Sequence, residues 1–202
     1  MRIEDVAGVI LTGGRSLRMG GGDKCLLPLA GRPLLAHIVS RAAPQVSALA
    51  LNANGDPARF AAFGLTVVAD DVPGFPGPLA GILAGMEWVR RERPGCRWLA
   101  SFPGDAPLLP PDLVERLALA AAGAEMACAA SGGRDHPVVG LWPVALASSL
   151  RHAIEVEDIR KITRWTGRFQ IGHAEWPADP VDPFFNVNTP DDLSALERLV
   201  AG

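Results

Sequence analysis

Short apolar runs alternate along the chain with longer stretches in which apolar residues recur every three or four positions. The short runs are typical of buried strands, and the longer spacing is typical of amphipathic helices. Strands that alternate with helices favour a mostly parallel sheet covered on both faces. We therefore expect an α/β fold, a single-domain three-layer αβα arrangement with a Rossmann-like, mostly parallel sheet. The predicted strands are residues 6–12, 48–53, 66–69, 97–102, 125–130 and 137–142.

The stretches with helical spacing separate these strands. The clearest stripe consists of Leu79, Ile82, Leu83, Met86 and Val89. Thr189 is suited to cap the last helix, with Pro190 at its first position. The predicted helices are residues 32–46, 57–63, 78–93, 110–122, 144–154, 157–166 and 190–200. No repeat or linker divides the chain, so we expect one domain over residues 1–202, with the proline-rich segment 177–183 as a surface crossing.

A glycine-rich basic loop follows the first predicted strand. The loop contains Gly13 and Gly14, then Arg18, three further glycines and Lys24. Glycine allows backbone N–H groups to turn inward and form a nest for an anion, and the two cations add full positive charge. The loop matches neither the Walker A pattern nor the dinucleotide fingerprint G-x-G-x-x-G. It nevertheless indicates a polyphosphate site.

Polar residues collect where other predicted strands end, which is where open α/β sheets bind ligands. Asp105 follows an apolar strand in the turn PGDAP, and a carboxylate opposite a polyphosphate loop is suited to hold Mg²⁺. Asn52 and Asp70 are candidates for base or ribose contacts, because an amide offers donor and acceptor and a carboxylate accepts two donors. The alternative for all three is an ordinary turn or capping role.

Two further segments carry candidate chemistry. Residues 76–81, PGPLAG, precede a long helix whose free N–H groups make a second possible anion site. The segment RDHP contains His136, which could touch a ligand but more often has a structural role beside proline.

Composition narrows the choice of partners. The chain has 202 residues, 19 basic and 22 acidic side chains and a net charge of −3. We therefore expect no nucleic-acid partner, and no apolar run reaches membrane-spanning length, so we expect no membrane partner either. The cysteines are odd in number and lack C-x-x-C spacing, which argues against a disulfide framework or a structural zinc site and suits a reducing cytoplasm. They are Cys25, Cys96 and Cys128.

The order of these motifs resembles that of the molybdenum cofactor guanylyltransferase family, within the nucleotidyltransferase superfamily. The features that carry the resemblance are LTGGRSLRMGGGDK, LALNAN, PGPLAG, PGDAP, GRDHPVVGL and FFNVNTP. They extend over nearly the whole chain. Thr12 departs from the pattern, since many members have alanine there, and its bulk lies beside the expected base pocket.

The resemblance implies a function and a set of site residues. The implied reaction transfers GMP from GTP to the phosphate of molybdopterin, with or without bound molybdenum, and releases pyrophosphate. GTP contacts are implied at Leu11, Thr12, Gly13, Gly14, Lys24, Asn52, Asp70 and Asp105. Arg18, Lys24 and Asp105 are the expected catalytic residues, with Mg²⁺ at Asp105. Molybdopterin is expected near Gly77, Gly81, Asn186 and Asn188.

Other interpretations remain open at this point. The chain could transfer CMP to molybdopterin or a nucleotide to a sugar 1-phosphate, or it could be a nucleotide-binding module without turnover. Gly13 and Gly14 favour guanine, because they leave no side chain between the backbone and a purine. Further expected partners are molybdenum-insertion proteins and acceptor molybdoenzymes, and we expect a cytoplasmic monomer.

Overall fold

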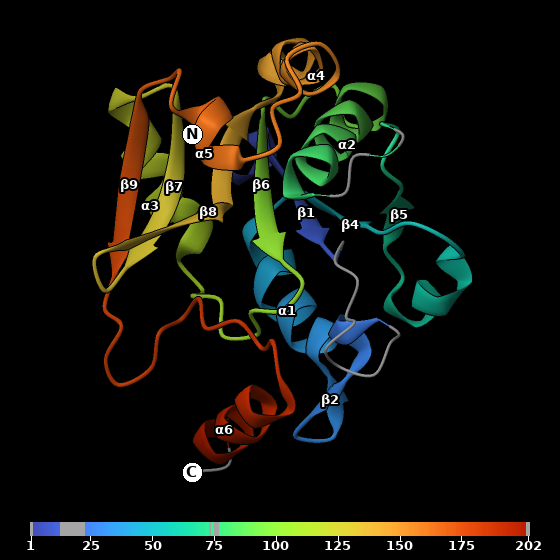
Figure 1. The fold of residues 1–202 in the computed structure, drawn as a ribbon, viewed down its shortest axis with the longest axis vertical. Helices are drawn as coiled ribbons and strands as arrows, with labels where there is room; N and C mark the ends of the chain where they lie inside the picture. Colours follow the sequence, from blue (N-terminus) through green and yellow to red (C-terminus); the bar gives the residue numbers. More distant parts are fainter. Residues whose placement is uncertain (1, 13–22, 73, 75–76, 201–202) are drawn as a thin grey trace.

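A seven-stranded sheet runs through the centre of the molecule in the order β5-β4-β1-β6-β8-β7-β9 (Figure 1). The structure is a computed structural model and describes residues 2–12, 23–72, 74 and 77–200. All strands of this sheet run parallel except β8, which is antiparallel to both of its neighbours. The strands are β1 Val6–Leu11, β4 Ala48–Asn52, β5 Thr66–Val68, β6 Trp98–Pro103, β7 Met126–Ser131, β8 Arg134–Pro143 and β9 Ile171–Trp176.

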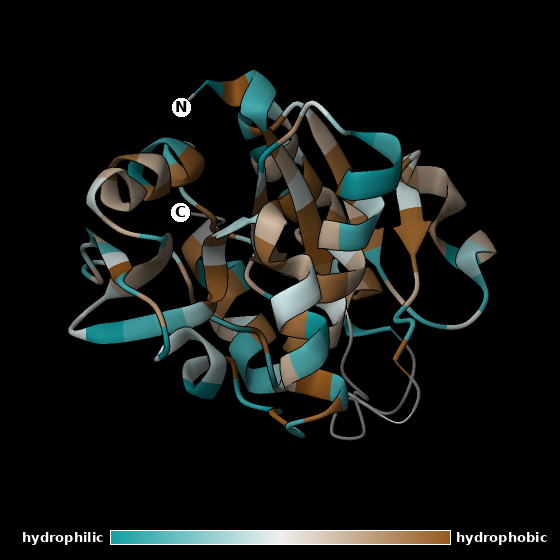
Figure 2. Ribbon diagram, turned by 90° about the horizontal axis from the view of Figure 1, so that it is seen from above, coloured by the Kyte–Doolittle hydropathy of each residue, from teal (hydrophilic) through white to brown (hydrophobic). Residues whose placement is uncertain are grey.

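Helices cover both faces of this sheet and complete three layers. Neighbouring strand residues face opposite layers, as Val9 and Ile10 do, so each face contributes to its own core. One layer consists of α1 Leu34–Ala42 and α3 Leu113–Ala120. The other consists of α2 Pro78–Glu92, α4 Ala147–Glu155 and α5 Ile162–Thr166. Figure 2 shows the hydrophobic strands enclosed between these helices. The expected αβα fold is therefore confirmed.

The last helix, α6 Pro190–Val200, lies apart from these layers at the lower end of the molecule in Figure 1. It packs against a small hairpin of β2 Pro28–Leu29 and β3 Arg32–Pro33. Leu29, Leu34, Val187 and Leu196 form the core of this contact. This contact places Val187, just before α6, beside Leu29 and Leu34, which follow the basic loop in the sequence.

Short 3₁₀ turns connect several of these elements. They are η1 Ile3–Asp5, η3 Lys24–Leu26, η4 Ala43–Gln45, η5 Pro57–Phe63, η6 Ala121–Gly123 and η7 Val144–Leu146. Among the described residues, no helix is both long and apolar enough to cross a membrane.

All six expected strands are present, and so is the short helix expected over 57–63, which is a 3₁₀ helix. The sequence-based expectation was wrong elsewhere. The edge strand β9 was missed. The helix expected from residue 32 begins at Leu34, because Arg32 and Pro33 belong to the hairpin. The helix expected over 157–166 begins only at Ile162, because Asp158 has φ of 51°, outside the right-handed helical region.

Candidate active site

The carboxyl ends of the central parallel strands meet at one edge of the sheet. Leu11, the last residue of β1, pairs with Asn52 of β4 on one side and with Pro103 of β6 on the other. The residues that follow each strand therefore lie side by side at this edge. This is the position at which open α/β sheets bind ligands.

Lys24, Asp105 and Asn188 come together at this edge from three distant parts of the sequence. The Lys24 ammonium donates to Asp105 Oδ2 at 2.7 Å and to Asn188 Oδ1 at 2.8 Å. The Asp105 side chain is 27% exposed and that of Lys24 is 19% exposed, so both are accessible to a ligand. The structure thus supplies one cation and two oxygen acceptors directed at a common point, which we call the Lys24–Asp105 centre.

Backbone contacts hold the Asp105 loop independently of its side chain. The Gly104 N–H donates to the carbonyl of Leu11 at 2.9 Å, and the Val187 N–H donates to the carbonyl of Asp105 at 2.9 Å. A Cβ at Gly104 would lie 2.8 Å from that Leu11 oxygen, so the close approach requires glycine. These contacts fix the carboxylate beside the end of β1.

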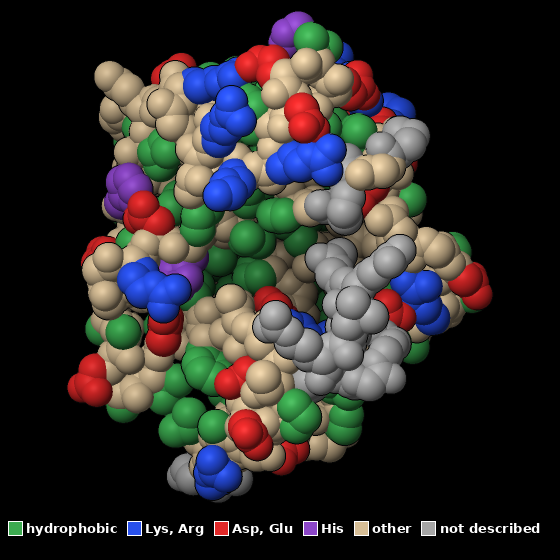
Figure 3. Space-filling view, in the orientation of Figure 1, with side chains coloured by type: hydrophobic (Ala, Val, Ile, Leu, Met, Phe, Trp, Pro, Cys, Tyr) green, Lys and Arg blue, Asp and Glu red, His purple; other side chains and the backbone are tan. Residues whose placement is uncertain are grey.

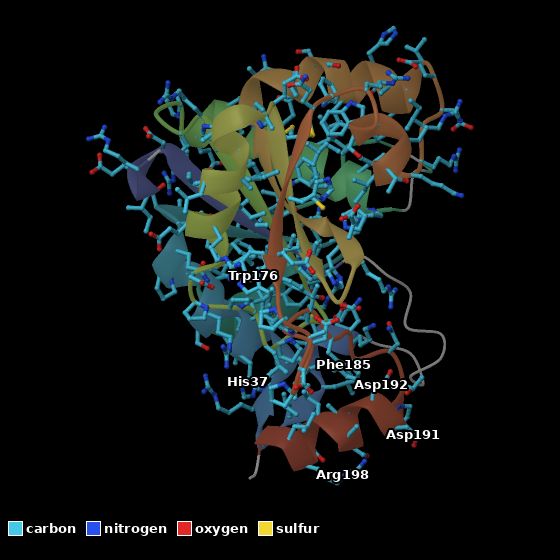
Figure 4. All side chains as sticks on the ribbon, turned by 90° about the vertical axis from the view of Figure 1, so that its left-hand side faces the viewer. His37, Trp176, Phe185, Asp191, Asp192 and Arg198 are labelled. Carbon is cyan, nitrogen blue, oxygen red and sulfur yellow. The ribbon has the colours of Figure 1, made fainter. Side chains whose placement is uncertain are left out.

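Asn188 is fixed by the cap of α6. Asp192 Oδ2 accepts the backbone N–H groups of Asn188 and Thr189, each at 2.8 Å, and the Thr189 hydroxyl accepts the Asp192 N–H at 3.1 Å. The bond from the Asn188 N–H is the largest cause that lowers the pKa of Asp192. Thr189 is thus the cap that the sequence predicted. Figure 4 shows Asp192 and Asp191 at the end of α6 opposite Arg198.

A second polar network lies at the ends of β4 and β5. The Asn52 amide donates to the Val68 carbonyl at 3.1 Å and to Asp70 Oδ1 at 2.9 Å. Asn54, which sequence reasoning missed, donates to the other Asp70 oxygen at 2.8 Å. Asn52 is only 3% exposed, so its amide hydrogens serve the protein itself, while the partly exposed Asp70 carboxylate keeps lone pairs for a ligand. A direct contact of Asn52 with a base stays a prediction.

Two of the expected binding glycines lie on either side of the start of α2. Gly77 is the N-cap residue of this helix, and a Cβ there would meet no atom within 4 Å. Gly81 is buried in the first turns, where a Cβ would overlap Asn52 Oδ1 and lie 2.8 Å from Leu11 Cδ2. Gly81 therefore allows α2 to approach the ends of β1 and β4. Contacts of either glycine with molybdopterin stay predictions.

We expect Gly81→Ala to destabilise the fold by about 1–3 kcal/mol, the usual effect of overpacking. The added methyl must displace the Asn52 carboxamide, which holds Asp70. Gly95→Ala is the matched control, because a Cβ at Gly95 meets nothing within 4 Å. Urea unfolding of the three proteins measures the effect. A Gly81 variant as stable as the control would contradict the close approach.

His136 belongs to a hydrogen-bonded cluster with Ser131 and Asp182. Its Nε2 lies 2.7 Å from Ser131 Oγ, and the Ser131 hydroxyl donates to Asp182 Oδ1 at 2.8 Å. Asp182 also accepts the Phe184 N–H at 2.9 Å, and the His136 and Phe184 rings lie 4.7 Å apart. Burial is the largest effect on His136 and lowers its pKa. The cluster ties β7 and β8 to the crossing that leads to Asn186, and the RDHP motif was its only sequence signal.

Asp182→Ala is expected to lower the free energy of unfolding by about 1–2 kcal/mol. The substitution removes the acceptor of both the Phe184 N–H and the Ser131 hydroxyl, and Ser131 is 1% exposed. For a chain of this size each kcal/mol lowers Tm by roughly 2–4 °C. Because Ser131 also contacts His136 Nε2, the double variant with Ser131→Ala should lose less stability than the sum of the two single losses. Losses that add fully would contradict this account.

Three further residues of the expected site, Gly13, Gly14 and Arg18, lie outside the described residues. The Thr12 hydroxyl donates to the Asn52 carbonyl at 2.7 Å. Asn186 is exposed, as is Asn188, and the buried Val187 lies between them. Figure 3 shows that the face bearing this site is hollowed in the middle, with apolar side chains in the hollow and Lys and Arg side chains above it. The surface thus offers both apolar area and positive charge to a ligand.

Parallel strands with a lysine and a carboxylate at their carboxyl edge define an α/β domain of the nucleotidyltransferase class. The model of the MobA-like NTP transferase domain matches residues 8–171, and the chain belongs to this family. A protein of Bradyrhizobium sp. (strain ORS 278) named molybdenum cofactor guanylyltransferase is 59% identical and covers 97% of this chain and 93% of its own length.

Two solved structures share the fold. Molybdopterin-guanine dinucleotide biosynthesis protein A from Archaeoglobus fulgidus has a TM-score of 0.73 at 22% identity, over 96% of this chain and 98% of that one. Rv0371C from Mycobacterium tuberculosis, solved as a complex with manganese, has a TM-score of 0.70 at 20% identity, over the same shares, 96% and 98%. At these identities the likeness concerns the fold alone.

Proposed function

We propose that this enzyme transfers GMP from GTP to the phosphate of molybdopterin and releases pyrophosphate. The observation that carries the proposal is the Lys24–Asp105 centre at the carboxyl edge of the sheet. It pairs a cation for phosphate oxygens with a carboxylate, in a chain 59% identical to a protein with the name of this activity. Phosphoryl-type transfer needs positioning and charge neutralisation rather than covalent work by the protein.

In the proposed reaction, a phosphate oxygen of the acceptor attacks the α-phosphorus of GTP. A P–O bond forms to the acceptor as the bond to the β-phosphate breaks, and the electron pair leaves with pyrophosphate. The attacking phosphate is already largely ionised near neutral pH, so no general base is required. Lys24 binds the phosphates, and Arg18 with the backbone of Gly13 and Gly14 is assigned to them from sequence alone.

The residues present fit a divalent cation of the Mg²⁺ type. Asp105 and Asn188 offer a carboxylate and an amide oxygen, the ligand atoms that Mg²⁺ takes together with substrate phosphates. The Lys24 ammonium lies between these oxygens, which shows that they attract a cation, and Mg²⁺ would take this position once Lys24 turns to the phosphates. A bound Mg²⁺ would neutralise charge on the triphosphate. The manganese complex of the mycobacterial structure is consistent with a divalent metal in this fold.

A pyrophosphate-release assay tests the proposal directly. Reactions contain GTP, Mg²⁺ and molybdopterin, with and without prior loading of molybdenum. We expect pyrophosphate only when acceptor and nucleotide are both present, and release equal to the guanine dinucleotide product formed. Release with a sugar 1-phosphate instead would favour that alternative, and no turnover with any acceptor would favour a binding module.

The enzyme is expected to have a kcat/KM for GTP that is roughly 10-fold or more above its kcat/KM for CTP. Guanine presents two adjacent donors, N1–H and N2–H, to which the Asp70 carboxylate is suited, and a buried polar group left unpaired costs about 1–3 kcal/mol. Asp70→Asn should reduce the preference. Because Asn52 and Asn54 both donate to Asp70, the unfolding of this variant is measured in parallel. A preference for CTP would overturn the guanylyl assignment.

The remaining assignments follow from the same proposal. Asn186, Asn188 and the start of α2 at Gly77 are assigned to molybdopterin, and acceptor molybdoenzymes with molybdenum-insertion proteins are the proposed partners. A reducing cytoplasm suits the three cysteines, which are free and buried. Light scattering of the purified chain tests the proposed monomer.

A further inference from the structure

Three potential metal ligands from neighbouring strands converge on one face of the sheet. Cys128 of β7 pairs with His173 of β9, so their side chains lie next to each other. Asp135 of β8 pairs with Ala130, two residues beyond Cys128 and therefore on the same face. One thiol, carboxylate or imidazole ligand atom from each of the three lies within 4.8 Å of the other two.

This group of three, the Cys128 cluster, is separate from the Lys24–Asp105 centre. Two strands lie between β6, which leads to Asp105, and the edge strand β9. Asp135 and the next residue, His136, face opposite sides of the sheet, so the cluster shares no side chain with the Ser131–His136–Asp182 group. Figure 1 shows α3 behind β7 and β9, where it packs on the face that buries Ala129 and Ala174, so the cluster lies on the other face of the sheet.

The donor set selects one class of metal. A thiolate, an imidazole and a carboxylate are the ligands of Zn²⁺, whereas Mg²⁺ and Ca²⁺ take oxygen ligands. Cys128 is 6% exposed, while the side chains of Asp135 and His173 are 53% and 48% exposed. An ion can therefore reach the cluster from solvent and contact the sulfur below. Three protein ligands leave one tetrahedral position for water.

We propose that Cys128, Asp135 and His173 bind Zn²⁺ or a similar transition-metal ion, and that the bound ion links β9 to β7 and β8. The existing contact between His173 Nδ1 and Asp135 Oδ1, at 2.9 Å, already holds two of the ligands together. A metal link between strands stabilises an edge strand more than a central one, because an edge strand is hydrogen-bonded on one side only. An ion that binds only the folded state stabilises the fold by RT ln(1 + L/Kd), where L is the free metal concentration, so the stabilisation grows with that concentration. The cysteine spacing gave no sign of the site because its ligands come from three strands.

Metal titration of the purified full-length chain tests the proposal. Zn²⁺ is titrated against a chromophoric chelator, and Co²⁺ is added separately because its absorption reports a thiolate ligand. We expect one equivalent to bind, a thiolate-to-cobalt band, and a rise in Tm with Zn²⁺ that is also seen when Mg²⁺ is already present. Absence of saturable binding at one equivalent would overturn the proposal.

Variants locate the bound ion. Cys128→Ser and His173→Gln should each weaken Zn²⁺ binding by about 100-fold or more, since even outer-shell changes cost 10–100-fold. The half-exposed His173 keeps the test valid if the buried cysteine variant does not fold. Cys96→Ser is the matched control, because Cys96 is a buried cysteine that contacts Ser47 and the Glu4 carbonyl. Unchanged binding in His173→Gln, or equal loss in the Cys96 control, would contradict the assignment.

Discussion

Asp105→Ala is expected to lower kcat by about 10²–10³-fold, the range for loss of one preorganised electrostatic contact at a reacting centre. The carboxylate lies 2.7 Å from the Lys24 ammonium at the edge where the phosphates are proposed to bind. The fold should survive, because the backbone of Leu11 and Val187 holds the loop whether or not the side chain is present. Steady-state pyrophosphate release and urea unfolding measure the two effects separately.

Two comparisons separate a role in metal binding from a general loss of charge. Asp105→Asn keeps the shape but weakens the ligand, so it should need more Mg²⁺ to reach half of its own maximal rate. Asp191→Ala removes an exposed carboxylate from the first turn of α6 and should leave kcat unchanged. A normal kcat in Asp105→Ala, or a Mg²⁺ dependence of Asp105→Asn equal to that of the unmodified chain, would exclude this role.

The central sheet could be predicted because its strands are buried on both faces and therefore appear as continuous apolar runs. The strand β9 lacks this signal. It is an edge strand with the sequence IGHAEW, in which exposed His173 and Glu175 alternate with buried Ala174 and Trp176. Glycine and charge within so short a segment hide the alternation. Likewise, no pattern of apolar residues predicts the left-handed backbone at Asp158.

The Lys24–Asp105 centre could be predicted in part, because a basic glycine loop and a carboxylate at a strand end each have a local motif. Its third member was expected near a different ligand, since the contact between Lys24 and Asn188 joins residues 164 positions apart. Only the packing of α6 on the hairpin brings that asparagine into place. The Ser131–His136–Asp182 group was missed for the same reason, because Asp182 comes from the proline-rich crossing and no spacing rule connects it to β7.

Lys24→Ala is expected to lower kcat/KM by about 10²-fold or more, with both kcat and KM affected. The ammonium binds the ground-state triphosphate, and it also opposes charge that moves toward pyrophosphate during transfer. Its effect on stability should be small, about 0–1 kcal/mol, because the pair with Asp105 is partly exposed and screened by solvent. A large kinetic loss with little change in unfolding would therefore mark a functional cation.

The geometry around Lys24 also predicts how its variants combine. Lys24→Arg should not restore full activity, since a planar guanidinium cannot take the place of a compact ammonium between Asp105 Oδ2 and Asn188 Oδ1. Because Lys24 and Asp105 are in contact, the double alanine variant should lose much less than the product of the two single losses. Arg198→Ala, at the opposite end of α6 from Asp191, is the control for loss of a cation (Figure 4). Full activity in the arginine variant, or strictly multiplicative losses in the double variant, would show that Lys24 and Asp105 do not act as one centre.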